Sequence, residues 1–177
     1  MESVGRGTVA GGNALAPRTK VALTLVASAA LVGAVFAAPV TEGGRKFITA
    51  LTGQAELDGG RLTADMDGSG TAEVFVNVGQ GRVCWNLVNL QNLDTLVASH
   101  IHQGPINGQG PIRINFFDFG QPIDLEGCVE AGTTPHLFDR DRLIDLSEHP
   151  ENYYVNVHTT AFTGGAIRGQ LGRGKQD

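Results

Sequence analysis

Two histidines separated by one residue are the first feature of the sequence that could carry chemistry. His100 and His102 flank Ile101 within the run Ser99–Gln103. Because successive side chains of a β-strand point to opposite faces, a strand here places both imidazoles on one face, about 7 Å apart. Imidazole nitrogen binds both Zn²⁺ and Cu²⁺, so the pair predicts two ligands of one metal ion.

A third histidine lies near the C-terminus, in the segment 153–158. Strand alternation puts His158 on the same face as Tyr154 and Asn156 and gives the opposite face to the core. If this strand lies near His100 and His102, His158 completes a three-histidine site that leaves a coordination position open. Copper or zinc is the ion that we expect there.

The same histidines also suit a structural role. They could bond to backbone carbonyls or to Asn156, and so organise the loop from Gly104 to Pro111. Acid–base chemistry by a histidine is a third and weaker alternative. His136 and His149 lie in polar surroundings, and we expect both to be exposed and outside any site.

Alternating apolar and polar residues predict the strands that must position these side chains. The expected strands cover residues 47–57, 70–78, 82–90, 95–102, 112–117, 153–158 and 166–171. Glycine-rich turns separate many of them, and one helix is expected over 140–147, with Asp139 as its cap. This pattern predicts an all-β fold, an antiparallel sandwich with Greek-key-like connections and one short helix before the penultimate strand.

The first 37 residues have the anatomy of a secretory signal peptide. Three basic residues precede an apolar run over 21–36, and the small residues Ala37 and Ala38 follow. We expect cleavage between these two alanines and a secreted or cell-surface protein. An uncleaved membrane anchor is the alternative, since residues 21–40 are just long enough to span a bilayer. Residues 38–46 are expected to be a linker and residues 172–177 a C-terminal tail.

The charge of the chain argues against nucleic-acid partners. The 177 residues carry a net charge of −5, and removal of residues 1–37 leaves 10 basic against 17 acidic residues, a net charge of −7. An acidic surface repels phosphate backbones and anionic lipid headgroups. Membrane contact is therefore expected only through an uncleaved leader.

The length of the chain after the leader suits one domain, which we expect to cover residues 47–171.

Cys84 and Cys128 are the two cysteines of the chain. An exported protein passes through a compartment in which thiols oxidise, so we predict that they form a disulfide. In the chain-entropy model, closing a loop of this length stabilises the fold by about 4 kcal/mol.

Arg168 stands in an apolar strand, between Ile167 and Leu171. A buried arginine must be paired, so we expect it to reach Glu56 or a cluster of carbonyls and to hold the last strand against the first. Glu56, Asn156 and Arg168 are thus the expected structural polar residues.

Four motifs along the chain recur in one known family. They are Leu51–Glu56, His100–Pro105, Tyr154–Thr159 and Gly165–Leu171. In this order they resemble the CHRD (chordin-type) domain, and the resemblance covers residues 47–171. The sequence departs from the family pattern at Thr163, where proline is usual.

The resemblance implies an extracellular all-β module, of the kind found in growth-factor antagonists and as stand-alone exported bacterial proteins. It predicts a non-enzymatic binding or structural module whose partner is an extracellular protein or a surface ligand. It implies no catalytic residues, and the sequence lacks a nucleophile elbow, a phosphate loop and a dinucleotide fingerprint. The alternative is a copper- or zinc-binding protein, or a metal-dependent redox enzyme, that uses His100, His102 and His158.

Overall fold

The computed structural model describes residues 44–133 and 138–172. The expected leader, most of the expected tail and His136 lie outside these residues. Within them, eight strands form one antiparallel sheet in the order β5-β4-β7-β8-β1-β2-β3-β6. None of the described helices is long and apolar enough to cross a membrane.

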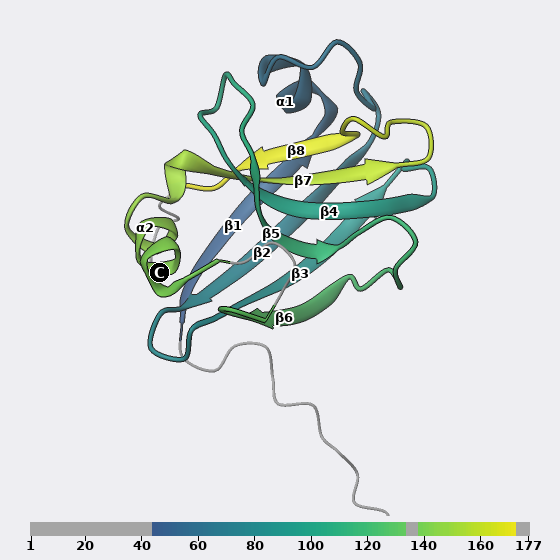
Figure 1. Cartoon of the computed structure of the whole chain (residues 1–177). Coiled ribbons are helices and arrows are strands. Elements are labelled where there is room, and N and C mark those ends of the chain that lie inside the picture. The colour runs from purple at the N-terminus through teal and green to yellow at the C-terminus, as the bar shows by residue number, and fades with distance from the viewer. Residues whose placement is uncertain (1–43, 134–137, 173–177) are drawn as a thin grey trace, which may run out of the picture. The chain divides into compact units, whose positions relative to one another are not determined.

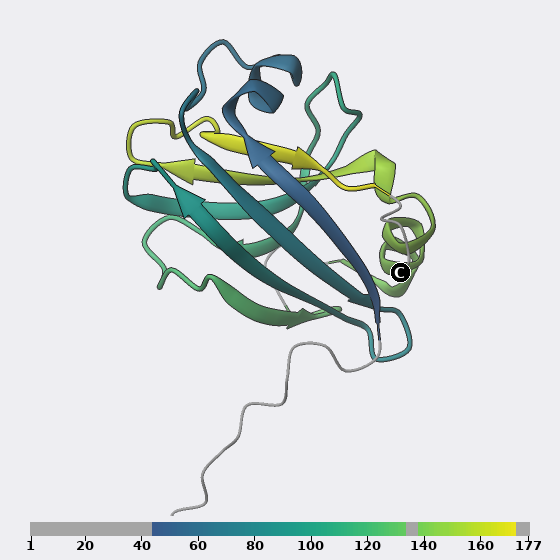
Figure 2. The same ribbon diagram turned by 180° about the vertical axis from the view of Figure 1, so that it is seen from behind.

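The strands and helices follow one another along the chain with short connections. In order they are β1 (Arg45–Thr52), α1 (Gly53–Asp58), β2 (Ser69–Asn77), β3 (Arg82–Gln91), β4 (Leu96–Gln103), β5 (Ile112–Phe117), β6 (Glu126–Glu130), α2 (Arg140–Glu148), the 3₁₀ turn η1 (Pro150–Asn152), β7 (Tyr153–Thr159) and β8 (Ile167–Gln170). Figure 1 shows β4, β5, β7 and β8 as a layer that crosses β1, β2 and β3, and Figure 2 shows the second layer from behind. The predicted antiparallel sandwich, with a helix before the penultimate strand, is confirmed.

The hydrophobic core lies between the two layers and is built from alternate residues of their strands. Trp85 of β3 stacks on Phe116 of β5, with ring centroids 4.5 Å apart. In β7 the core takes Tyr153, Val155 and Val157, the set that alternation predicts. Burial of a large apolar side chain contributes about 1.5–3 kcal/mol, so this face fixes the register of β7 and with it the direction of His158.

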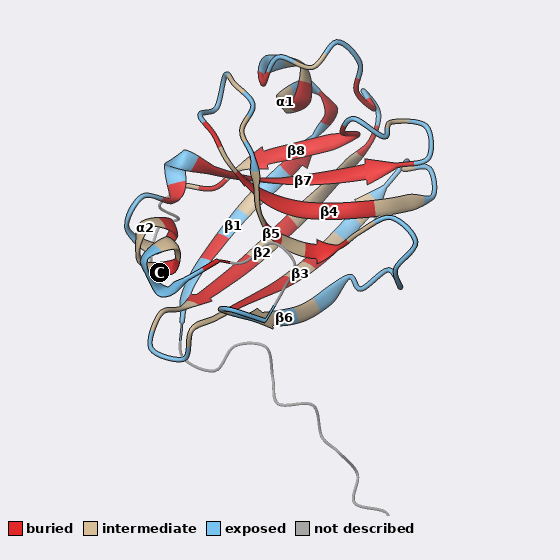
Figure 3. Ribbon diagram, in the orientation of Figure 1, coloured by how far each residue is buried: buried red, intermediate tan, exposed pale blue. Residues whose placement is uncertain are grey.

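The polar face of β7 is also buried, a point on which alternation makes no prediction. Every residue of β7 is buried, and Figure 3 shows β4, β7 and β8 as the most thoroughly buried strands. The segment between β4 and β5 bonds to this face, since Gly110 donates its backbone N–H to the Tyr154 hydroxyl. Gly104 donates its own to the backbone oxygen of Asn152, just before β7. Polar side chains on a buried face must find partners within the protein.

The segment 47–57 is not one strand, as the alternation predicted, because the chain turns into α1 after Thr52. The Thr52 side chain accepts a hydrogen bond from the backbone N of Ala55, which caps the helix. A Cβ on Gly53 would lie 1.9 Å from the carbonyl oxygen of Asp65, so only glycine fits where the helix begins. The helix carries Glu56 onto the polar face.

Two further boundaries differ from the expectation. β1 begins at Arg45, inside the expected linker, because Lys46 pairs with Glu73 of β2 at 2.9 Å. The strand β6 was not predicted, because it is short and Val129 is the only large apolar side chain in it. It is the edge strand next to β3, and Val129 packs against the core while Gly127 lies against Trp85.

The predicted disulfide joins Cys84 of β3 to Cys128 of β6. The two cysteines stand directly opposite each other in the antiparallel pair. This covalent bond adds to the backbone pairing that holds β6 at the edge of the sheet.

Arg168 is buried and lies on the polar face of β8, where it pairs with Thr52 of β1. Its guanidinium donates hydrogen bonds to the carbonyl oxygens of Pro105 at 2.7 Å and Gly108 at 2.8 Å. It also lies 3.4 Å from the centroid of the Tyr154 ring. Of the two partners expected for this arginine, the structure gives it the carbonyl cluster.

Glu56 is 1% exposed and accepts a hydrogen bond from the side-chain amide of Asn156. Burial raises the pKa of Glu56 to about 7, although the charges of Arg168 and Arg61 and the Asn156 hydrogen bond act in the opposite direction. The folded protein therefore binds a proton at Glu56 more tightly than the unfolded chain does.

Replacement of both cysteines by alanine should destabilise the protein and free β6. Loss of a loop closure over a sequence separation of 44 residues should lower the free energy of unfolding by about 4 kcal/mol. Urea unfolding of the double variant measures the loss. The wild type should show no reactive thiol even when it is unfolded in urea without a reductant, and two reactive thiols would contradict the bond.

Glu56→Gln should remove a pH dependence of stability. Because the pKa is raised in the folded state, the contribution of Glu56 to the free energy of unfolding is fully present below about pH 4.5 and is lost as the pH rises through about 7. A shift of that size corresponds to about 3 kcal/mol. Relative to wild type, Glu56→Gln should therefore gain stability between pH 4.5 and 8, as measured by urea unfolding across that range.

A matched control for this substitution is Glu126→Gln, because Glu126 is exposed on the edge strand β6. Its unfolding free energy should follow that of wild type at every pH. If Glu56→Gln also runs parallel to wild type, Glu56 does not titrate differently in the folded and unfolded states.

Candidate metal centre

The pairing of β4 with β7 brings three histidines together on the buried polar face. His100 stands opposite Asn156 and His102 opposite Tyr154, while His158 stands opposite Ala98. His158 is thus the diagonal neighbour of His100, a position from which two large side chains on one face can touch. All three histidines are buried, between 2% and 6% exposed.

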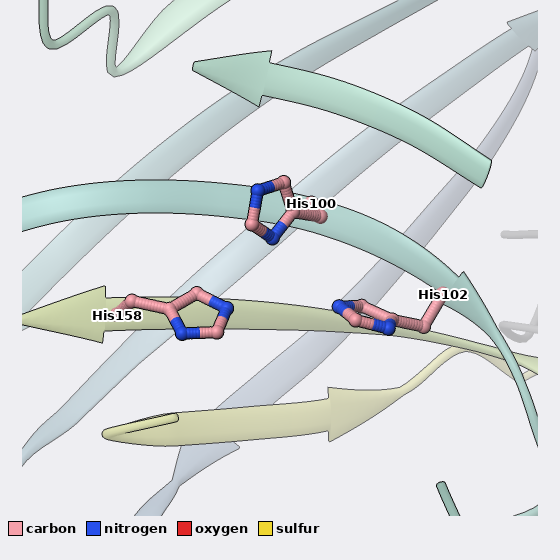
Figure 4. Close-up of side chains that lie close together, drawn as sticks. All are labelled: His100, His102 and His158. Carbon is pink, nitrogen blue, oxygen red and sulfur yellow. The ribbon is translucent and has the colours of Figure 1, made fainter. Parts of the chain in front are cut away.

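The three rings face a common space. One nitrogen from each ring lies within 4.8 Å of the others, and Figure 4 shows these nitrogens directed toward one another. The ring centroids of His100 lie 5.6 Å from His102 and 5.0 Å from His158, in edge-on contacts. Tetrahedral zinc with bonds of about 2.0–2.1 Å would hold its ligands about 3.4 Å apart, so the nitrogens must approach one another by up to about 1.4 Å.

Backbone carbonyls fix the ring orientation of two of these histidines. Nδ1 of His102 lies 2.9 Å from the oxygen of Gly110, and Nδ1 of His158 lies 2.9 Å from the oxygen of Thr163. Because a carbonyl oxygen can only accept, each Nδ1 must carry the proton. Nε2 of each ring then has a lone pair, the form that binds a metal.

Burial keeps these imidazoles neutral. It lowers the pKa of His102 to about 4, against the opposing effect of the hydrogen bond to Gly110. It also lowers the pKa of His158. A protonated imidazole cannot be a ligand, so both rings are held in the binding form at neutral pH.

The loop between β4 and β5 is shaped around His102. Gly110 accepts from Nδ1 of His102 and donates its backbone N–H to the Tyr154 hydroxyl at 3.3 Å. A Cβ on Gly110 would lie 1.6 Å from the oxygen of Gln103, so glycine alone permits this approach. The Tyr154 ring stacks on the ring of His102, with centroids 4.8 Å apart.

Asp118 is a residue of this site that the sequence did not single out. It follows β5, and its Oδ1 lies 3.8 Å from Nε2 of His100. No local sequence motif indicates Asp118, because it reaches the site only through the pairing of β5 with β4. His149 lies outside the cluster, half exposed and near Glu151.

The remaining polar residues singled out in the sequence line the same face without joining the cluster. Asn156 stands between Tyr154 and His158 along β7 and bonds to Glu56, while Arg168 stacks on Tyr154. Together they form a supporting layer beside the histidines.

Comparison with known proteins gives one family. A search of curated proteins and a search of solved structures each found no significant match. The family model of the CHRD domain matches residues 47–171, which include every strand from β2 to β8 and most of β1. This span, together with the antiparallel sandwich that it forms, shows that the chain belongs to the CHRD domain family.

Proposed function

We propose that this CHRD domain is an exported module that binds one copper or zinc ion through His100, His102 and His158. The pair of hydrogen bonds from Nδ1 of His102 and His158 to backbone oxygens carries the proposal. These bonds leave a lone pair on each Nε2 and aim it at the other rings. Ligand histidines in metalloproteins almost always have such a second hydrogen bond.

Two buried ring nitrogens without a protein hydrogen-bond partner also support a metal ion at this site. Within the described residues, Nε2 of His102 and Nε2 of His158 are buried without a hydrogen-bond partner. An unsatisfied buried polar atom costs about 1–3 kcal/mol. One ion at the centre of the cluster would satisfy both atoms and bind His100 as well.

Export of the protein is the second part of the proposal. The Cys84–Cys128 disulfide is of a kind that persists in oxidising compartments outside the cytoplasm. Membership of the CHRD family agrees with an extracellular location. The leader-like segment 1–37 supplies the means of export.

Binding of an extracellular protein or surface ligand stays a prediction from the family. The loop from Gly104 to Pro111 could present such a surface, since Ile106 is 67% exposed at its tip. A single exposed apolar side chain is ordinary on a protein surface, however. Metal binding is therefore the function that the geometry supports better.

Wild-type protein purified without a histidine tag should bind one Zn²⁺ or Cu²⁺ per chain, measured by elemental analysis after dialysis. Copper should bind more tightly than zinc, as expected for nitrogen ligands. A metal at 100 times its Kd should also raise the free energy of unfolding by about 2.7 kcal/mol.

The variants His102→Asn and His158→Asn test the ligands separately from the loop. The asparagine amide can donate in place of Nδ1, which preserves the bonds to Gly110 and Thr163, but it has no equivalent of Nε2. Metal affinity should fall at least 100-fold, beyond the roughly 10–100-fold typical of outer-shell changes. His149→Ala should bind like wild type, and equal losses in all three variants would refute the site.

The mature protein recovered from outside the cytoplasm should begin at Ala38. Intact-mass measurement of the chain checks this, because removal of residues 1–37 fixes the expected mass. A chain that keeps the leader and partitions with membranes would instead support the anchored alternative.

A further inference from the structure

We infer that Asp118 is a positioning residue of the proposed metal site, which holds His100 so that Nδ1 and not Nε2 becomes its ligand atom. The inference rests on the proposed function and adds to it an asymmetric ligand set. His102 and His158 bind through Nε2, whereas His100 binds through the opposite nitrogen.

The orientation of the His100 ring is the first observation. Figure 4 shows its Nδ1 directed into the space between His102 and His158, with Nε2 on the far side of the ring. On that far side, Nε2 lies 3.8 Å from Oδ1 of Asp118. The carboxylate therefore acts on His100 through Nε2, the nitrogen that is not directed at the other rings.

The carboxylate of Asp118 is itself held in place. Oδ1 accepts a hydrogen bond from the backbone N of Phe119 at 2.8 Å, and Oδ2 accepts one from the side chain of Asn115 at 3.4 Å. Asn115 stands opposite His100 in the β4–β5 pair. The segment 115–119 thus fixes the carboxylate of Asp118 relative to the imidazole of His100.

The pairing of β4 with β5 is irregular on both sides of His100. The register shifts between Ser99 and His100 and again between Ile101 and His102. Such bulges re-aim a side chain and are common next to functional sites. Here they bring the end of β5, and with it Asp118, toward the ring of His100.

A carboxylate beside Nε2 selects one tautomer of a neutral imidazole. It favours the proton on Nε2 and so leaves the lone pair on Nδ1, and it raises the basicity of that lone pair. The present 3.8 Å is longer than a hydrogen bond of about 2.9 Å, so the bond needs the carboxylate to approach Nε2 by about 1 Å. Because Nδ1 of His100 must move toward the other two rings to share a metal ion with them, Asp118 has to follow the ring in the same direction.

Exposure distinguishes Asp118 from the ligands. Its side chain is 34% exposed, against 3% for His100. A partly solvated carboxylate keeps its charge at low cost, so it can offset part of the charge of a buried cation. Three neutral imidazoles offer no such compensation.

The test combines zinc affinity with the tautomer of His100. In wild type, nitrogen chemical shifts from NMR should show the Nε2–H tautomer without metal and zinc attached at Nδ1 when it is bound. In Asp118→Ala the Nε2–H population of the apo protein should fall, and zinc affinity should drop about 10–100-fold. Asp118→Asn keeps an acceptor oxygen, so it should lie between the two.

Asp124→Ala is the matched control, because Asp124 is exposed in the same β5–β6 connection and only its backbone oxygen contacts Trp85. It should keep wild-type affinity and tautomer. The inference would be overturned if Asp118→Ala kept the wild-type zinc affinity and tautomer, or if zinc bound to Nε2 of His100. In either case, zinc binding by the wild type would still support the proposed function. Absence of both zinc and copper binding in wild type would refute the proposed function, and the apo tautomer would still decide the role of Asp118.

Discussion

The hydrogen bonds of the Arg168 guanidinium to the loop between β4 and β5 are the constraint on which the buried polar face depends. A guanidinium inside a protein must be matched by acceptors, and here Pro105 and Gly108 supply them. The same bonds hold the loop over β4 and β7. The loop then places Gly110 against His102, which is buried and has a lowered pKa. The charge on β8 thus supports, through the loop, the position of one of the three histidines.

The structural and the metal-binding interpretations of the histidines are compatible. Each interpretation uses a different nitrogen of the ring. Nδ1 of His102 and of His158 fastens a loop, as a structural histidine does, while Nε2 faces its neighbours. A ring with one bonded nitrogen is also better oriented as a ligand than a ring that rotates. The expected loop-organising role therefore prepares the metal-binding one.

Local alternation predicted the fold well where strands pack on a core. It identified most strands and both faces of β7, because burial of Val155 and Val157 imposes a period of two. It missed α1, where an N-cap at Thr52 and the tight approach of Gly53 to Asp65 override the apolar pattern. It also missed β6, a short edge strand with one large apolar side chain, Val129, that a disulfide and strand pairing join to β3.

The candidate site was predictable in part, for a different reason. The His100–His102 pair follows from one strand, so spacing alone revealed it. The approach of His158 depends on the register of β4 against β7, and that of Asp118 on an irregular pair of β4 and β5. Register is set by contacts between residues far apart in sequence, and bulges leave no simple pattern. Strand alternation could therefore offer His158 only as a third ligand conditional on its strand lying near the first.

Charge balance explains why the carboxylates matter to such a site. The polar face already holds the cation of Arg168, which stacks on Tyr154 as Tyr154 stacks on His102. A divalent ion among three neutral imidazoles would add a second positive centre to the same layer, and buried like charges repel. Glu56 lies beside Asn156 on one part of this face and Asp118 beside His100 on another. Because Glu56 is buried and its pKa is raised, the partly exposed Asp118 is the carboxylate better able to carry the compensating charge.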